Sequence, residues 1–214
     1  MKTIFFKLIF LLASSSVIFA ANNNYEKQKT ISFSAEIRNP NSDSLFIETP
    51  YGTDRLKSFK LNKGRLTKDS FEIQMGYYRI YDGKESTACF LKPGYDLHIS
   101  LNTEEFDESI QYTGKGSSVN NYMAKKYLLE EKLGSLTNYT YYAKLEEEDF
   151  LHLNDSIYNL QKDLLNKYKE NFEEDFIRLE SISIKTEYLS KNANYESMHK
   201  FLTDNNDFKV SDSF

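Results

Sequence analysis

Hydrophobic and polar residues alternate along the first half of the chain with the period of two that is typical of β-strands. The clearest run has apolar residues at every second position: Ile31, Phe33, Ala35 and Ile37. Further short runs follow at residues 45–47, 56–61, 71–75, 77–81, 97–101 and 110–112. Seven or eight strands separated by turns, without intervening helices, predict an antiparallel sandwich or barrel-like sheet over residues 28–113.

Glycines and prolines mark where these strands end or bend. Pro93-Gly94 predicts a tight turn between two strands, because proline presets φ and glycine tolerates a positive φ. Leu56, Phe59 and Leu61 predict one strand, and Phe71, Ile73 and Met75 predict the next. Gly76 then interrupts the pattern, which is typical of a bulge or bend.

From Ser117 onward the apolar residues recur with a helical period. The first stripe is Val119, Tyr122, Met123 and Tyr127, with Lys125, Lys126, Glu130 and Glu131 mostly outside it. The second stripe is Phe150, Leu153, Ile157, Leu160, Leu164 and Tyr168. A third helix is expected from Phe176 to Leu189 and a short fourth around Tyr195–Leu202. The fold class is therefore α+β, with a bundle of three to four helices over 117–203 and a linker or truncated end at 204–214.

The change from strands to helices falls at a glycine-rich hinge. Gly114 and Gly116 are expected to end the sheet, and Ser117 or Ser118 is expected to cap the following helix. A glycine-rich helix start can also bind phosphate, but the P-loop spacing is missing here. A strand-to-helix hinge is the preferred interpretation.

This region carries a family resemblance. The order of a strand, LKPGYDLHISL, a short acidic insert and IQYTGKGSSVNNYMAKKYLLEEK resembles the N-terminal accessory region of envelope-located TlpA/ResA-like thiol-disulfide oxidoreductases. The resemblance runs from about Thr30 to the C-terminus. Its more specific parts are the hairpin and the hinge motif, whose residues are Gly114, Gly116, Ser117, Asn120 and Tyr122.

In that family, a signal peptide, a small β-domain and a helical segment precede a thioredoxin domain with a Trp-Cys-x-x-Cys active site. This sequence has no Trp and one Cys, so the resemblance implies a place in a redox protein without redox chemistry in these residues. It implies protein partners: a thioredoxin-like domain, a second protomer or a client, docking on the helices. No catalytic, cofactor-binding or metal-binding residue is predicted.

The N-terminus has the pattern of a secretory signal. Lys2 and Lys7 precede an apolar run, and small residues lead to a cleavage site after Ala20 or Ala21. The alternative, an uncleaved membrane anchor, is disfavoured because the apolar run is short and broken by serines. Export to the periplasm or cell envelope of a Gram-negative bacterium is therefore predicted, with no membrane span after cleavage. Loss of two lysines changes the net charge from −5 to −7, which argues against nucleic-acid binding.

The residues most often used in catalysis are sparse and scattered. Cys89 is the one cysteine and lies in an apolar strand pattern, so a buried core residue is favoured over a reactive thiol. His98, His152 and His199 show no metal-ligand spacing. The acidic run Glu146–Asp149 can collect a cation, but its position favours the first turn of a helix.

Tyrosines gather in two clusters, Tyr77–Tyr81 and Tyr139–Tyr142, which could line a sugar or peptide groove or could simply pack around the core. Asp43-Ser44-Leu45 and Asp155-Ser156-Ile157 resemble short bacterial O-glycosylation signals. Three functions follow. The first is a non-catalytic extracytoplasmic docking module of a thioredoxin-like thiol-disulfide interchange protein. The alternative is a free-standing exported ligand-binding protein with an aromatic groove on the β domain, and a hydrolase using dispersed carboxylates is the third.

Overall fold

The computed structural model describes residues 29–134, 139–212 and 214. The predicted signal peptide at 1–20 and the predicted start of the β domain at residue 28 lie outside the described residues, so both stay predictions. Within the described part of the chain, no helix is long and apolar enough to cross a lipid bilayer.

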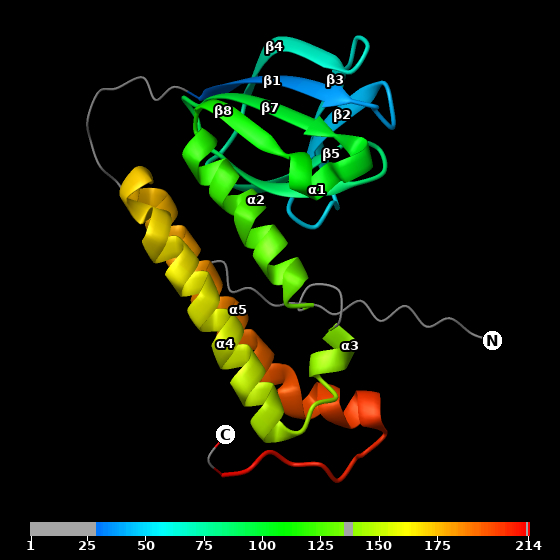
Figure 1. Ribbon diagram of the computed structural model, residues 1–214, viewed down its shortest axis with the longest axis vertical. Helices are drawn as coiled ribbons and strands as arrows, with labels where there is room; N and C mark the ends of the chain where they lie inside the picture. Colours follow the sequence, from blue (N-terminus) through cyan, green and yellow to red (C-terminus); the bar gives the residue numbers. More distant parts are fainter. Residues whose placement is uncertain (1–28, 135–138, 213) are drawn as a thin grey trace, which may run out of the picture.

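The first half of the protein is a sandwich of two four-stranded sheets (Figure 1). One sheet has the order β4 (Arg65–Glu72), β1 (Thr30–Arg38), β7 (Asp96–Asn102) and β8 (Gln111–Lys115). The other has the order β3 (Arg55–Lys60), β2 (Ser44–Glu48), β5 (Gly76–Tyr81) and β6 (Ser86–Leu91). The predicted α+β class, with a sandwich first and helices after it, is confirmed.

One strand pair differs from the expected antiparallel arrangement. β1 and β7 are parallel, with Phe33 opposite Leu97, whereas all other paired strands are antiparallel. Between these two strands the chain forms β2 and β3 in the second sheet, β4 in the first, and β5 and β6 in the second again. A long crossover of this kind is what parallel pairing requires.

The core of the sandwich follows the alternation seen in the sequence. Ile31, Phe33, Ala35 and Ile37 on β1 are all at most 4% exposed, and their polar neighbours face outward. The strand predicted from Leu56, Phe59 and Leu61 is present as β3, in which Leu56 is 49% exposed while Phe59 is buried. Residues three apart cannot share one face of a strand, since side chains alternate with a period of two.

Gly76 does not interrupt a strand. β4 ends at Glu72 in one sheet and Gly76 is the first residue of β5 in the other. Ile73 and Met75 therefore belong to the connection between the sheets, and Met75 is 37% exposed. The apolar alternation of the sequence continues through this connection. The prediction therefore counted the end of β4 and the connection as a single strand.

The helices follow the sandwich, apart from a short acidic turn between β7 and β8 that holds η1 (Thr103–Glu105) and α1 (Phe106–Ser109). The later elements are α2 (Ser117–Lys132), α3 (Tyr139–Tyr142), α4 (Glu147–Tyr168), η2 (Lys169–Asn171) and α5 (Glu174–Thr203). The expected third and fourth helices are one continuous helix, α5, because no proline or glycine interrupts it.

α2 packs along the sandwich, and α4 and α5 form a long hairpin that runs beside α2 and extends beyond the sheets (Figure 1). One apolar cluster joins both sheets to Val119, Tyr122 and Phe176 of the helices. A second cluster at the far end of the hairpin contains Tyr142, Ala143, Phe150 and Tyr195.

The segment 204–214, predicted as a linker or truncated end, folds back on this second cluster. The ring of Phe214 stacks on that of Tyr195 with centroids 5.5 Å apart, and Phe208 stacks on His199 at 4.0 Å. The backbone N–H of Ser211 donates to Glu147 over 2.7 Å. Its two aromatic residues thus pack against the hairpin.

The helix stripes differ from the predicted ones at several positions, including Ile182 and Leu189 of α5, which are 54% and 50% exposed. Leu160 of α4 is 39% exposed, and Gln161 beside it is 2% exposed. On α2, Lys126 and Glu130 are buried although they were expected outside the stripe. Paired polar groups replace apolar ones along the inner faces of these helices, and this pairing defines the candidate site.

Candidate binding groove

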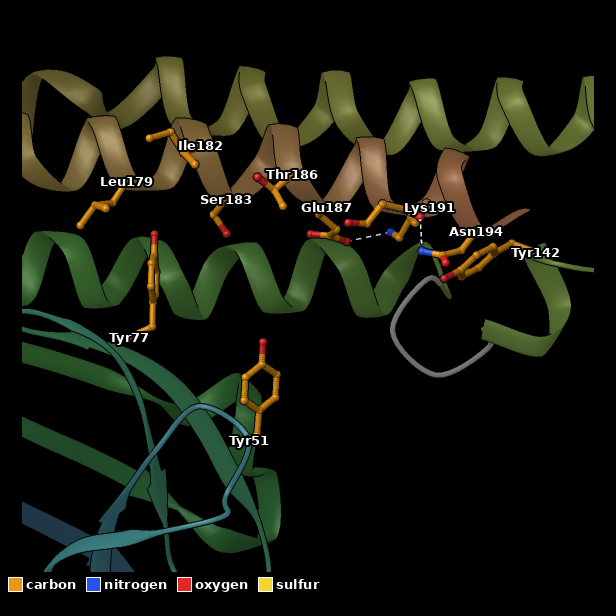
Figure 2. A pocket seen from close by; sticks show the side chains of 11 residues that line it. Tyr51, Tyr77, Tyr142, Leu179, Ile182, Ser183, Thr186, Glu187, Lys191 and Asn194 are labelled. Atoms are coloured by element: carbon orange, nitrogen blue, oxygen red, sulfur yellow. Dashed lines mark hydrogen bonds and ion pairs between the residues drawn. The ribbon is translucent and has the colours of Figure 1, made fainter. Parts of the chain in front are cut away.

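A groove of about 450 Å³ lies between α5 and the sandwich, with α3 at one end (Figure 2). Its lining comes from four separate parts of the fold. Tyr51 lies in the turn between β2 and β3, Tyr77 on β5, Tyr142 on α3, and the remaining lining residues all lie on α5.

Tyrosine side chains form most of the wall opposite α5. Tyr51 is 73% exposed, and its ring and that of Tyr77 point from the sheet side toward α5 in Figure 2. Tyr142 lies near Lys191 and Asn194 at the other end. Each predicted tyrosine cluster therefore contributes one residue, while Tyr51 was missed because it is a single aromatic residue in a turn.

The α5 wall combines apolar and short polar side chains. Leu179 and Ile182 lie at the Tyr77 end, and Ile182 is 54% exposed. Toward Tyr142 the helix presents small hydroxyl and amide groups: Ser183, Thr186, Ser190 and Asn194. A ligand in this groove would meet apolar and aromatic surface together with hydrogen-bonding groups.

Buried polar contacts fix α5 to the rest of the protein beneath the groove. Glu180 is fully buried, and its carboxylate accepts hydrogen bonds from Tyr77 Oη over 2.6 Å and from Tyr122 Oη over 3.0 Å. Lys126 Nζ donates to the same carboxylate over 2.8 Å. One carboxylate on α5 thus joins the sheet and α2, and a buried charge with three donors has the partners that burial requires.

Electrostatics in this contact keep the donors protonated. Burial and the Glu180 carboxylate raise the pKa of Tyr77 and of Tyr122, so both phenols retain their protons. Burial alone would lower the pKa of Lys126, but Glu180 and Glu130 outweigh it and raise that pKa. Lys126 therefore stays an ammonium group.

The contacts continue along the helices to the groove. Gln161 Nε2 of α4 donates to Glu130 Oε1 of α2, and at 3.4 Å to Glu187 Oε2 of α5. Lys191 Nζ donates to Glu187 Oε1 over 2.7 Å, and both of these residues line the groove. The buried polar residues and the groove are therefore parts of one connected set.

The hinge residues lie where α2 joins the sandwich. Gly114 is inside β8, opposite Leu97, and an added Cβ would lie 2.1 Å from the Asp96 carbonyl oxygen. Gly116 is the N-cap of α2, with φ 99° and no side-chain cap. The sheet ends at Lys115, directly before Gly116, so the predicted end at these glycines holds for Gly116 and not for Gly114. The expected serine cap is wrong, because a positive-φ glycine makes the turn. Ser117 is the first residue of α2.

Two adjacent asparagines attach α2 to the edge of each sheet. Asn120 accepts from Phe90 N over 2.8 Å and donates to Phe90 O over 3.0 Å on β6, and it is 0% exposed. Asn121 makes the same pair of bonds with Tyr112 N and O on β8, at 2.9 and 2.8 Å. β6 and β8 are edge strands, so α2 closes the open side of the sandwich.

The remaining predicted residues lie apart from the groove. Cys89 is 0% exposed, as predicted for a core residue, and burial raises the pKa of its thiol. His98 bonds to Ser34 Oγ over 2.9 Å, His152 is exposed on α4, and His199 is buried against Phe208. The acidic residues Glu147, Glu148 and Asp149 form the first turn of α4, as expected.

Within the described residues, no group of His, Cys, Asp and Glu has an arrangement that could hold a metal ion. Ser44 lies at the start of β2 and Ser156 on α4, where its hydroxyl donates to the His152 carbonyl. No protein-family model, curated protein or solved structure matches this chain significantly. The TlpA/ResA resemblance stays a prediction.

Proposed function

We propose that this protein is a non-catalytic binding module whose groove between α5 and the sandwich holds a segment of a partner protein. The carrying observation is that the groove exposes large apolar side chains, Tyr51 at 73% and Ile182 at 54%, beside hydrogen-bonding groups. Exposed apolar surface rimmed by polar groups is typical of interaction sites.

The walls of the groove support this function because they are held rigidly. α5 is tied to the sheet through Tyr77 and Glu180 and to α2 through Lys126. A site built on fixed elements loses little conformational entropy when a partner binds. Among the described residues that line the groove, Tyr51 alone lies outside a helix or strand.

The resemblance to TlpA/ResA-like accessory regions makes a thioredoxin-like domain, a second protomer or a client protein the partner class to test. Export, proposed from the signal pattern of Met1–Ala20, agrees with that class. Reading the DNA downstream of codon 214 tests this context. A continuing frame with Trp-Cys-x-x-Cys favours it, whereas a stop followed by an unrelated gene favours a free-standing protein.

A free-standing ligand-binding protein is the second candidate. It is favoured by the size of the groove, because about 450 Å³ lies within the range of small-molecule sites. The tyrosine rings and the hydroxyl groups of α5 also suit a ligand with both apolar and polar faces.

The test is a selection of random peptides displayed on phage against the purified protein, followed by affinity measurements with the synthesised winners. We expect Ile182→Glu to weaken binding by about tenfold or more, because it places a charge in an apolar contact. Leu160→Glu is the matched control, since Leu160 is similarly exposed at 39% but lies on α4 outside the groove. Failure to select any peptide, or equal binding by both variants, would contradict the proposal.

A further inference from the structure

Two arginines of the second sheet share one carboxylate, that of Glu48 on β2. Arg55 of β3 donates to Glu48 Oε1 from Nε over 3.4 Å and from Nη2 over 3.2 Å. Arg79 lies opposite Glu48 on β5, with its Nη2 at 3.5 Å from Glu48 Oε2. No other carboxylate of the described residues forms an ion pair with either arginine. The ion-paired cluster therefore contains one positive charge in excess.

Arg79 has few hydrogen-bond acceptors within the fold. A guanidinium carries N–H donors on each of its nitrogens, and those of Arg79 donate no hydrogen bond to another described residue. Its Nε is buried without a partner, although buried donors are nearly always paired. The side chain as a whole is 29% exposed. A guanidinium with unused donors, in part open to solvent, suits an anionic acceptor from outside the fold.

Aromatic rings support both guanidiniums from one side. Arg55 lies over the ring of Phe46 at 3.6 Å from its centroid, and Arg79 lies over the ring of Tyr81 at 5.7 Å. The two rings are themselves neighbours, with centroids 6.0 Å apart. Stacking uses the faces of the guanidiniums and leaves their N–H groups, which lie in the plane, for a carboxylate. The two cations are therefore held in place before a ligand arrives.

This cluster adjoins the binding groove. Arg79 follows Tyr77 by two positions on β5, so the two side chains leave the same face of the sheet. Tyr51 also lines the groove, and a Cβ added to the next residue, Gly52, would lie 2.8 Å from Arg79 Nη1. The turn that carries Tyr51 thus contacts Arg79. A segment bound against Tyr51 and Tyr77, whose rings point toward α5 in Figure 2, lies next to this cluster.

We infer that Arg79, with Arg55 beside it, binds a carboxylate side chain, so that the partner segment in the groove carries an Asp or Glu next to its apolar contacts. This inference rests on the proposed function and adds the chemistry of the partner. The argument for this occupant is charge complementarity: the cluster has one cation more than it has carboxylates. One carboxylate balances that charge, and its two oxygens match paired N–H groups of a guanidinium.

The experiment titrates ¹⁵N-labelled protein at low salt with N-acetyl-aspartate α-amide and with its neutral analogue, N-acetyl-asparagine amide. The arginine Nε–Hε signals and the backbone amide of Gly52 are followed. We expect the aspartate probe to shift the signals of Arg79, Arg55 and Gly52, and the asparagine probe to bind at least about fivefold more weakly. Arg79→Gln should remove that difference. Arg38→Gln, which changes an exposed arginine of the other sheet, is the matched control and should keep it.

A second arm uses the peptides displayed on phage. Because these peptides are joined to the coat protein through their C-terminus, any carboxylate that they bring to Arg79 belongs to a side chain. We expect Asp or Glu to be enriched among the peptides selected on the wild type, and this enrichment to be lost in a selection on Arg79→Gln.

Equal binding of the two probes, shifts away from Arg79, or tighter binding of inorganic phosphate than of the aspartate probe would overturn the inference. Selected peptides without enrichment of Asp or Glu would overturn it as well. Failure of the proposed function is a different result, because uncharged peptides that lose affinity for Ile182→Glu would leave the groove a binding site. The comparison of probes uses the wild-type protein, so it does not depend on the folding of Arg79→Gln.

Discussion

Replacing Asn120 with alanine should destabilise the protein far more than the same change at its neighbour Asn121. Both asparagines bond the backbone N–H and C=O of one residue on an edge strand. Asn120 is 0% exposed and also donates to the Gly116 carbonyl over 2.9 Å, whereas Asn121 is half-buried. The two sites thus differ mainly in access to water.

The magnitude follows from that difference. Asn120→Ala removes three hydrogen bonds and leaves the N–H and C=O of Phe90 in the core without partners, and each buried orphan costs about 1–3 kcal/mol. A loss of roughly 3–5 kcal/mol is therefore expected. Asn121→Ala exposes the corresponding groups of Tyr112 to water, which can replace the lost bonds, so roughly 1–2 kcal/mol is expected.

Urea unfolding followed by far-UV circular dichroism measures both free energies of unfolding. Circular dichroism of each variant before unfolding checks that the helix content is unchanged. Equal losses for the two variants, or a loss below about 1 kcal/mol for Asn120→Ala, would refute the reasoning that burial decides the cost.

Three further outcomes follow from the buried groups. Folding raises the pKa of Glu130 to about 7, so protonation of Glu130 favours the folded state. This stabilisation is complete below the pKa that Glu130 has in the unfolded chain and is lost as pH rises through 7. The free energy of unfolding should thus fall by on the order of 1 kcal/mol between about pH 6 and pH 8, and Glu130→Gln should abolish that fall in urea titrations. Lys126→Met removes the cation that bonds the buried Glu180 and should cost about 3–5 kcal/mol, against less than about 1 kcal/mol for the exposed Lys132→Met, measured by the same method. Cys89 should react with a maleimide only after denaturation, because it is fully buried and its pKa is raised; stoichiometric labelling of the native protein would contradict that placement.

The sheets could be predicted from sequence because β-strands reveal their buried face in two-residue alternation. Ile31 to Ile37 gave the orientation of β1 correctly. The parallel pairing of β1 with β7 could not be predicted in the same way, since strand order depends on contacts far apart in the chain. Met75 was wrongly included in a strand, because apolar alternation alone does not show where a strand ends.

The helices could be predicted in extent but not in their inner faces. A stripe was drawn through apolar residues only, so Leu160 was included in place of Gln161. The buried positions of α4 are spaced three or four apart: Phe150, Asn154, Ile157, Gln161 and Leu165. Polar residues at regular positions within an apolar stripe were the available signal, and it points to buried hydrogen bonding between helices.

The groove was foreseen only as a tendency of tyrosines to cluster. Tyr77 and Tyr142 come from clusters that were recognised, but they lie 65 positions apart in the sequence. No local sequence pattern predicts that α5 runs between these two tyrosines. The contact that places it there, Tyr77 to Glu180, joins residues 103 positions apart.

The buried polar residues therefore connect the two halves of this protein in a way that apolar packing alone would not. An apolar interface tolerates sliding of one helix along another, since its attraction is not directional. A carboxylate held by two phenols and an ammonium group allows one register, because each bond depends on direction and length. The register of α5 decides which of its residues face Tyr51 and Tyr77, so the same contacts that hold the hairpin on the sandwich also determine that Ile182 and Glu187 line the groove.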